Sequence, residues 1–239
     1  MKILGVIPAR YASSRFPGKP LIDIKGKSMI QRVYEGAKQC KEIDQIVVAT
    51  DDERIYKHVV DFGGDVIMTS SLHQTGTERC GEVVKKYSEV DVIINIQGDE
   101  PLVNHMQLSQ LLQVFETLPE TEIATLVTQV TDPSDLNNPN RIKVLLKANG
   151  EALCFSRNAI PSMLHPSNYT PLRHIGLYAY KTKCLSKLVQ LPSCEWEKSE
   201  SLEQLRWLYY GYAIQTVITS IETPNIDVPE DLAKVLKHL

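Results

Sequence analysis

The chain has 239 residues, of which 43% are hydrophobic and 23% charged, as is usual for a folded globular protein. Its formal net charge of −3 argues against nonspecific binding of nucleic acid through bulk charge. The sequence has no signal peptide pattern and no apolar stretch long enough to span a bilayer, so we expect a cytoplasmic protein without membrane partners. The five scattered cysteines are expected to be reduced thiols.

The first half of the chain alternates strand-like and helix-like segments, which is typical of right-handed βαβ units and a parallel sheet. The predicted strands are residues 2–8, 45–50, 66–68 and 92–96. The predicted helices are residues 28–41, 52–62, 77–87 and 104–116. The second of these helices should end at Gly63 and Gly64, because glycine is the usual helix terminator.

The second half of the chain is less regular. The predicted strands are residues 123–130, 142–146, 152–155, 174–180 and 213–220, with a hairpin turn at residues 148–150. The predicted helices are residues 182–191, 201–210 and 229–238. We expect an α/β fold with a mixed, mostly parallel sheet flanked by helices. No Pro/Ser-rich linker divides the chain, which favours a single domain over residues 1–239.

Three cations follow the first predicted strand, among small residues and a glycine: Arg10, Arg15 and Lys19. Open α/β sheets bind ligands at the carboxyl ends of their strands, and cations beside uncrowded backbone N–H groups can hold a polyanion there. The stretch therefore predicts a phosphate-binding loop. Its spacing is not G-x-x-x-x-G-K-[ST], which disfavours a P-loop kinase or ATPase. A solvated basic loop is the alternative interpretation.

Two aspartates are candidate metal ligands. Asp99 follows the predicted strand 92–96 and Gly98, at the same end of the sheet as the basic loop. Mg²⁺ prefers carboxylate and phosphate oxygens, which makes Asp99 a candidate ligand, although a carboxylate at a helix N-terminus is the alternative. Asp227 follows a late strand, where a capping role and a ligand role are equally open. Gln97, beside Asp99, offers an amide donor and acceptor.

A second group of residues suits a carboxylated, hydroxyl-rich sugar. The guanidinium of Arg157 can pair with a carboxylate through two hydrogen bonds, and the side chains of His174 and Tyr178 can bind hydroxyls. His174 and Tyr178 should share one face of a strand, because they are four residues apart. A strand histidine that only satisfies the core is the alternative interpretation.

Residues 7–21 resemble the signature of the sugar-acid cytidylyltransferases. Further matching blocks follow in order along nearly the whole chain, at residues 48–52, 76–79, 95–101, 155–157, 174–178, 202–206 and 227–231. The resemblance implies a Rossmann-like, three-layer α/β/α fold of the nucleotide-diphospho-sugar transferase type. It also implies transfer of CMP from CTP to a 3-deoxy sugar acid (Kdo) with release of pyrophosphate, for lipopolysaccharide biosynthesis. A homodimer is implied, through a dimerisation and sugar-binding segment near residues 155–180.

The resemblance also implies roles for individual residues. The implied nucleotide-binding residues are Ala9, Arg10, Ser13, Arg15, Lys19, Thr77, Arg79, Gln97 and Asp99. The implied catalytic residues are Lys19, Arg15, Asp99 and Asp227, and the two aspartates would hold Mg²⁺. The implied sugar-binding residues are Arg157, His174, Tyr178, Glu203 and Gln204.

Three other functions stay open. The same chemistry could act on a related acid, 8-amino-Kdo or a sialic acid. A sugar-1-phosphate nucleotidyltransferase or a glycosyltransferase could use the same type of fold, but would need a phosphate or a glycosyl donor where Arg157 and His174 suit a carboxylate. A non-catalytic nucleotide-binding module would need neither a metal pair nor a second substrate pocket.

Overall fold

The computed structural model describes residues 1–12, 16–87, 89–162, 164–165, 168–226 and 228–238. The chain divides into two compact units: unit 1 comprises residues 1–112 and 223–239, and unit 2 comprises residues 113–222. This division does not decide whether the chain is a single domain, which stays a prediction. Within the described part of the chain, no helix has both the length and the apolar character of a bilayer-spanning segment.

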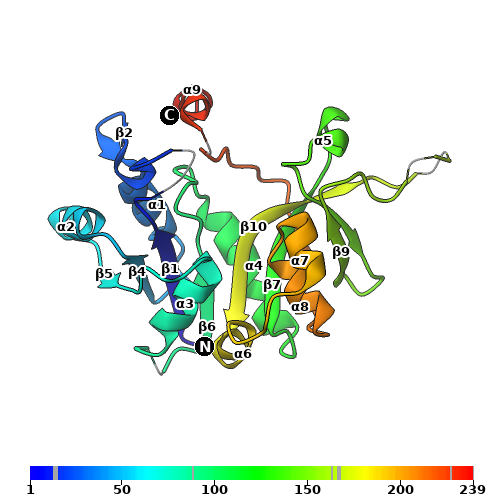
Figure 1. The fold of residues 1–239 in the computed structure, drawn as a ribbon, viewed down its shortest axis with the longest axis horizontal. Coiled ribbons are helices and arrows are strands. Elements are labelled where there is room, and N and C mark those ends of the chain that lie inside the picture. The colour runs from blue at the N-terminus through cyan, green and yellow to red at the C-terminus, as the bar shows by residue number, and fades with distance from the viewer. Residues whose placement is uncertain (13–15, 88, 163, 166–167, 227, 239) are drawn as a thin grey trace. The chain divides into compact units, whose positions relative to one another are not determined.

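Unit 1 is built on four parallel strands around β1 (Figure 1). In order across the sheet they are β6 (Val92–Asn95), β1 (Ile3–Ala9), β4 (Gln45–Thr50) and β5 (Val66–Met68). β1, β4 and β6 are almost continuously buried, as their apolar runs require when both faces of a sheet are covered. The predicted strands of the first half are therefore confirmed, with bounds that differ by one residue or so.

Helices α1, α2 and α3 pack on these strands. Their bounds are Met29–Ala37, Glu53–Asp61 and Gly76–Val84. Each begins at a side chain that accepts a hydrogen bond from an otherwise unpaired helix N–H: Ser28, Asp52 and Thr75. After α2 the chain turns at Gly63, whose φ of 77° favours glycine, so the predicted helix end is confirmed.

Unit 1 also contains short elements that the sequence patterns did not predict. They are η1 (Lys19–Leu21), β2 (Asp23–Ile24) and β3 (Lys27–Ser28). Lys25 and Gly26 join the two strands with positive φ at both positions, which is typical of a tight hairpin turn. The helix predicted at 229–238 begins instead as the 3₁₀ turn η2 (Pro229–Asp231) and continues as α9 (Leu232–Leu236).

In unit 2 the sheet is mixed, with β7 (Ile123–Gln129) between a parallel and an antiparallel neighbour. The parallel neighbour is β11 (Gln215–Ile218) and the antiparallel one is β10 (Leu172–Lys181). β8 (Lys143–Leu146) pairs antiparallel with β10 and with β9 (Ala152–Ser156). The predicted hairpin turn between β8 and β9 is confirmed, with Gly150 at a φ of 81°.

The helices of unit 2 are short. Helix α4 (His105–Thr117) leads into this unit from unit 1, and the others are α5 (Ser134–Asn137), α6 (Thr182–Leu188), α7 (Glu195–Glu200) and α8 (Gln204–Tyr209). The prediction of one helix over residues 201–210 is wrong at its start. Ser201 adopts a left-handed conformation, with φ 49° and ψ 49°, which ends α7 and delays the start of α8.

Candidate active site

A cavity of about 490 Å³ in unit 1 contains most of the predicted nucleotide-binding residues. Its lining includes Ala9, Arg10, Lys19, Arg79, Gln97 and Asp99. Ala9 ends β1, and Gln97 follows β6, so the cavity lies where two parallel strands finish. This is the edge at which open α/β sheets bind ligands. Thr77, another predicted contact, is buried in the first turn of α3.

The closest pair of opposite charges in this cavity is Lys19 and Asp99. The Lys19 Nζ lies 2.9 Å from Asp99 Oδ2 and also donates to the carbonyl of Ile226, at 2.8 Å. The side chain of Lys19 is 13% exposed and that of Asp99 is 30% exposed, so both are partly shielded from water. Residues 80 positions apart are thus joined by a charge-assisted hydrogen bond at the predicted site.

Gly98 sets the path of the turn that carries Gln97 and Asp99. A Cβ at position 98 would lie 2.6 Å from the backbone oxygen of Pro8, closer than any real carbon contact. Only glycine therefore lets this turn approach the end of β1 as closely as it does. The close approach places Asp99 in the same cavity as Ala9 and Arg10.

The segment before Asp227 is bonded to Asp99. The backbone N–H of Ile226 donates to the Asp99 carbonyl at 3.0 Å, and the Thr223 hydroxyl donates to the Glu100 carboxylate at 3.2 Å. Asp227 itself lies outside the described residues, so its metal-binding role stays a prediction. Its sequence neighbour Ile226 nevertheless lies within one hydrogen bond of both Asp99 and Lys19.

Arg10 is exposed and is the first cation of the predicted phosphate-binding loop. Its Nη1 donates to the carbonyl of Gln74 at 3.4 Å, and Gln74 also lines the cavity. Gln74 was not among the residues that sequence reasoning selected, although it lies just before the matching block at 76–79. The predicted contacts Ser13 and Arg15 lie outside the described residues and stay predictions.

Arg79 lines the cavity, but its guanidinium is held by protein groups. The residue is completely buried; its Nη2 lies 3.2 Å from Asp51 Oδ2, and its Nη1 donates to the Thr69 hydroxyl. A buried arginine needs such partners, because an unpaired charge in the interior is costly. The proposed contact with cytidine is untested, and the structure adds a role that the sequence did not indicate, since Arg79 ties α3 to the end of β4.

The predicted sugar-binding residues all belong to unit 2. His174 and Tyr178 share one face of β10, as expected, with ring centroids 5.2 Å apart. The pairing of β10 with β7 is irregular between Ile175 and Tyr178, where β10 has two extra residues. Because two is an even number, His174 and Tyr178 still lie on the same face of the strand. The His174 Nε2 lies 2.9 Å from the Thr125 hydroxyl.

Burial keeps both of these side chains uncharged near neutral pH. Burial lowers the pKa of His174 to about 3, and the neighbouring Arg173 charge acts in the same direction. Burial, with the Glu203 carboxylate as a second cause, raises the pKa of Tyr178 well above its ordinary value. Both groups can therefore bind hydroxyls as neutral donors or acceptors, and neither can supply a charge to a substrate at pH 7.

Arg157 differs from the expectation that its guanidinium is free for a carboxylate. Its Nη1 donates to the Pro139 carbonyl at 2.8 Å, its Nη2 to the Ser201 carbonyl at 3.2 Å, and its Nε to the Glu200 carbonyl. These bonds join Arg157 to the carboxyl end of α7 and to Pro139. Each of the three guanidinium nitrogens donates one hydrogen bond to a backbone carbonyl. A structural role is therefore visible, and the substrate role stays a prediction.

Glu203 and Gln204 lie where α8 begins. Glu203 is the residue before the helix and is half-buried, and Gln204 is its first residue and is buried. The side chain of Gln204 is thus not on a solvated face of the helix. Sugar contacts by these two residues stay predictions.

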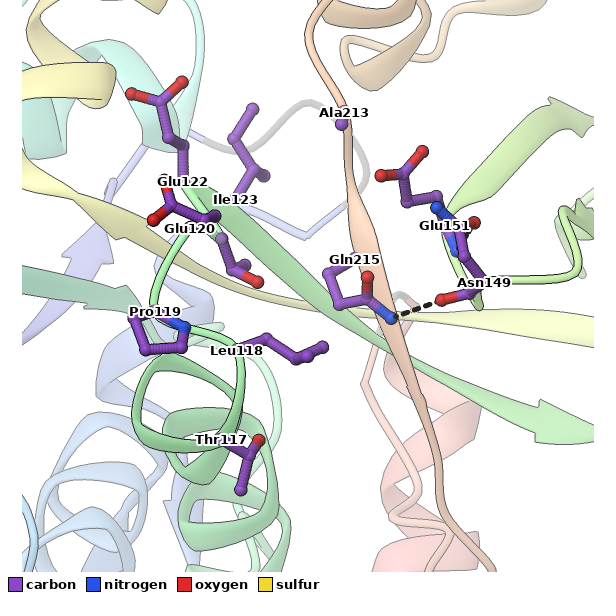
Figure 2. Close-up of a pocket in the computed structure, with 11 residues that line it drawn as sticks. Thr117, Leu118, Pro119, Glu120, Glu122, Ile123, Asn149, Glu151, Ala213 and Gln215 are labelled. Carbon is purple, nitrogen blue, oxygen red and sulfur yellow. Dashed lines mark hydrogen bonds between the residues drawn. The ribbon is translucent and has the colours of Figure 1, made fainter.

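Unit 2 has a cavity of its own, of about 380 Å³, which holds none of the predicted site residues (Figure 2). Figure 2 shows that Glu120 and Glu122 project from the segment that leads into β7, while Glu151 follows the β8–β9 turn. Across the cavity, the Gln215 amide donates to the Asn149 carbonyl at 3.4 Å. Its acidic lining is unlike a site for phosphates.

The nucleotide cavity has oxygen atoms of the kind that a metal binds. Among the described residues, no cluster of three or more His, Cys, Asp or Glu side chains is arranged to hold a metal. The oxygens that the structure does bring together are the Asp99 carboxylate and the Ile226 carbonyl, both of which hold the Lys19 ammonium. Of these, the Asp99 carboxylate is the kind of oxygen ligand that Mg²⁺ prefers.

Comparison with known proteins identifies the family. A model of the family described as Cytidylyltransferase matches residues 4–218. A 3-deoxy-manno-octulosonate cytidylyltransferase from Cytophaga hutchinsonii is 48% identical, over 98% of this chain and 96% of the relative. The enzyme of the same name from Chlamydia pneumoniae is 45% identical, over 99% of this chain and 93% of the relative.

Solved structures agree with this assignment. A CMP:2-keto-3-deoxy-manno-octonic acid synthetase, solved in complex with CTP, superposes with a TM-score of 0.95 at 42% identity and covers 100% of this chain and 98% of its own. A putative glucose-1-phosphate thymidylyltransferase from Bacillus anthracis, at 18% identity and a TM-score of 0.68 over 99% of this chain and 94% of its own, shares the fold alone. The predicted fold class is therefore confirmed. The chain belongs to the cytidylyltransferase family and is similar to its enzymes of the 3-deoxy-manno-octulosonate type.

Proposed function

We propose that this protein transfers CMP from CTP to 3-deoxy-D-manno-octulosonate, producing CMP-Kdo and pyrophosphate for lipopolysaccharide biosynthesis. The observation that carries the proposal is the pairing of Lys19 with Asp99, at 2.9 Å, in a cavity that also contains Arg10 and Gln97. A cation, a carboxylate and an amide at the carboxyl ends of β1 and β6 are the groups that a nucleoside triphosphate needs. The names of relatives that are up to 49% identical supply the substrates.

The chemistry requires positioning and charge stabilisation more than covalent work by the protein. The anomeric hydroxyl of the sugar acid would attack the α-phosphorus of CTP in line, and pyrophosphate would leave from the opposite side. Lys19 and Arg10, with Arg15, would bind the phosphates and stabilise the charge that develops on the leaving group. The Gln97 amide, which lines the cavity, would bind the base or the ribose.

Asp99 and Asp227 would hold Mg²⁺ in this proposal. The Asp99 carboxylate suits that role because it lies on the cavity wall, 30% exposed, and already accepts a hydrogen bond from one cation. When bound, Mg²⁺ supplies positive charge beside the α-phosphate and lowers the proton affinity of the attacking hydroxyl. The Ile226 N–H, bonded to the Asp99 carbonyl, would keep the two acidic positions near each other.

Two further parts of the proposal concern the assembly and the location of the protein. We infer a homodimer formed through the segment near residues 155–180, as the family resemblance implies. We also place the reaction in the cytoplasm, where CTP is made. Size-exclusion chromatography with light scattering would test the first inference, because a monomer at micromolar concentration would contradict it.

One experiment tests the function and its rivals together. Pyrophosphate release is measured with CTP and Mg²⁺ against a panel containing Kdo, 8-amino-Kdo, a sialic acid and glucose 1-phosphate. We expect release with Kdo at a kcat/KM well above that with the other acceptors. Preference for 8-amino-Kdo or a sialic acid would identify that acid as the substrate. Preference for glucose 1-phosphate would indicate a sugar-1-phosphate nucleotidyltransferase. No release of pyrophosphate with any acceptor would indicate a non-catalytic nucleotide-binding module.

The metal role is tested with the same assay. Replacing Asp99 with Asn keeps the size of the side chain but removes its charge, so we expect turnover to fall by about two orders of magnitude or more. Chelation of Mg²⁺ with EDTA should abolish turnover in the unmodified protein and restored Mg²⁺ should recover it. Activity close to normal in Asp99→Asn would exclude the carboxylate as a metal ligand.

A further inference from the structure

A cation stacked on an aromatic ring lies next to the residues that line the nucleotide cavity. The guanidinium carbon of Arg54 is 3.3 Å from the centroid of the Tyr11 ring, the distance of close stacking. Tyr11 lies between Arg10 and Ala12 in the sequence, and both of these line the cavity. Arg54 comes from α2, an element that supplies none of the predicted site residues.

Asp52 holds the Arg54 guanidinium in one orientation. Asp52 Oδ1 accepts from the Nε of Arg54 at 2.9 Å and Oδ2 accepts from its Nη2 at 2.7 Å. Asp52 also caps α2, because its carboxylate accepts from the backbone N–H of Arg54 at 2.9 Å. Such a two-point pair fixes the plane of the guanidinium, and its face is then available to the tyrosine ring.

Tyr11 is in turn fixed to Gly18. The backbone N–H of Gly18 donates to the Tyr11 carbonyl at 2.9 Å, and a Cβ at position 18 would lie 3.2 Å from the Cζ and Oη atoms of Tyr11. The φ of 74° at Gly18 also favours glycine. Gly18 is followed directly by Lys19, whose ammonium meets Asp99.

We propose that Arg54 is a positioning residue for CTP. It acts by holding Tyr11 and, through Tyr11, its neighbour Arg10 and, by way of the Tyr11–Gly18 hydrogen bond, Lys19. This inference rests on the proposed function for the identity of the nucleotide. In this proposal Arg54 acts through Tyr11 and not on CTP directly, because its guanidinium is paired with Asp52 and one of its faces lies on the tyrosine ring. Its effect is to hold Tyr11, Arg10 and Lys19 in place before CTP binds, so that fewer side chains are ordered on binding.

The test compares variants of the stacked pair in CTP affinity. Arg54→Ala and Tyr11→Leu should each weaken CTP binding by roughly two- to fivefold, the range expected for loss of a partly exposed cation–π contact. Arg54→Lys, which keeps the charge but not the flat face, should recover only part of the affinity. Tyr11→Phe keeps the ring and should recover most of what Tyr11→Leu loses. Combining Arg54→Ala with Tyr11→Leu should cost little more than either change alone.

The readouts separate positioning from general loss of structure. CTP affinity is measured by titration calorimetry without sugar acid, and the KM for CTP, the KM for Kdo and the thermal midpoint are measured on the same samples. We expect the KM for CTP to rise while the KM for Kdo and the midpoint stay unchanged. Lys57→Ala, which removes an exposed cation from the same helix, is the matched control and should change none of these values.

Three results would contradict the inference. One is an Arg54→Ala protein with unchanged CTP affinity, and another is an equal loss in Lys57→Ala, which would indicate a bulk charge effect. Additive losses in the double variant would also contradict the coupling between Arg54 and Tyr11. If the unmodified protein binds CTP but releases no pyrophosphate with any acceptor, the proposed function fails while the calorimetric comparison still tests the role of Arg54.

Discussion

His174 makes the stability of unit 2 sensitive to mild acid. Its ring lies against Phe155 and Tyr178, with centroids 5.2 Å from each, and its Nε2 is bonded to the Thr125 hydroxyl. Burial lowers its pKa in the folded protein to about 3, compared with 6.5 for an ordinary histidine. Below pH 6.5 the histidine is therefore protonated in the unfolded chain but stays neutral in the folded chain. The free energy of unfolding falls as the pH is lowered towards 3.

The magnitude follows from the two pKa values. Each pH unit well below 6.5 corresponds to about 1.36 kcal/mol, so lowering the pH from 7.5 to 5 should cost about 2 kcal/mol through His174 alone. Between pH 7.5 and 5 the effect of His174 can be measured largely by itself. Carboxyl groups with a lowered pKa, such as Glu197, begin to lose their contribution to stability only as the pH nears their ordinary pKa of 4.5. The buried Trp207 provides a fluorescence signal for unfolding from the same aromatic cluster.

The assay is urea unfolding at several pH values between 7.5 and 5, for the natural protein and for His174→Gln. We expect the variant to lose about 2 kcal/mol less than the natural protein over this range, whatever its absolute stability. His165→Gln, at an exposed histidine in the same unit, is the matched control and should follow the natural protein. An identical pH dependence in His174→Gln and the natural protein would refute the reasoning.

Two other substitutions test the packing around the nucleotide cavity. Gly98→Ala places a Cβ 2.6 Å from a carbonyl oxygen of β1, so thermal unfolding should show a loss of roughly 1–3 kcal/mol together with weaker CTP binding, whereas Gly176→Ala, with no atom within 4 Å, should change neither. Arg79→Met leaves the Asp51 carboxylate without its partner and should cost about 3 kcal/mol in urea unfolding. Arg141→Met, at a pair that is 43% exposed on the arginine side, should cost less than about 1 kcal/mol, and equal losses in the two variants would contradict this ranking.

The strands, and the location of Lys19 and Asp99 at one edge of the sheet, could be predicted because their signals are local. Apolar runs covered on both faces identify β1, β4 and β6, and parallel strands bring their carboxyl ends to one edge. A lysine after the first strand and an aspartate after the last of these therefore had to lie near each other. The 2.9 Å contact between Lys19 and Asp99 follows from that topology.

Side-chain partners were not predictable where distant segments decide them. Arg157 appeared free for a substrate, but its guanidinium contacts carbonyls of residues 18 and 44 positions away, which no local pattern encodes. The resemblance implied that Arg79 contacts the nucleotide, but its burial was not predictable because it depends on Asp51 and Thr69. The stacking of Arg54 on Tyr11 was not predictable either, since it joins two side chains that are distant in the sequence.

The break between α7 and α8 is a local feature that the sequence pattern did not reveal. Ser201 is in the left-handed region, where glycine or asparagine is more usual. A serine in a predicted helix does not by itself indicate a helix end. The carboxyl end of α7 is stabilised there by Arg157, from a distant part of the same unit. Tertiary contacts thus override the local preference.

Identification of the product tests the central claim most directly. The protein is incubated with CTP, Mg²⁺ and Kdo, and the nucleotide fraction is followed by phosphorus NMR and mass spectrometry. The account predicts that CTP converts to pyrophosphate and to a single CMP–Kdo adduct in equal amounts, and only when Kdo is present. Hydrolysis of CTP to free CMP, or no Kdo-dependent change in CTP at all, would contradict it.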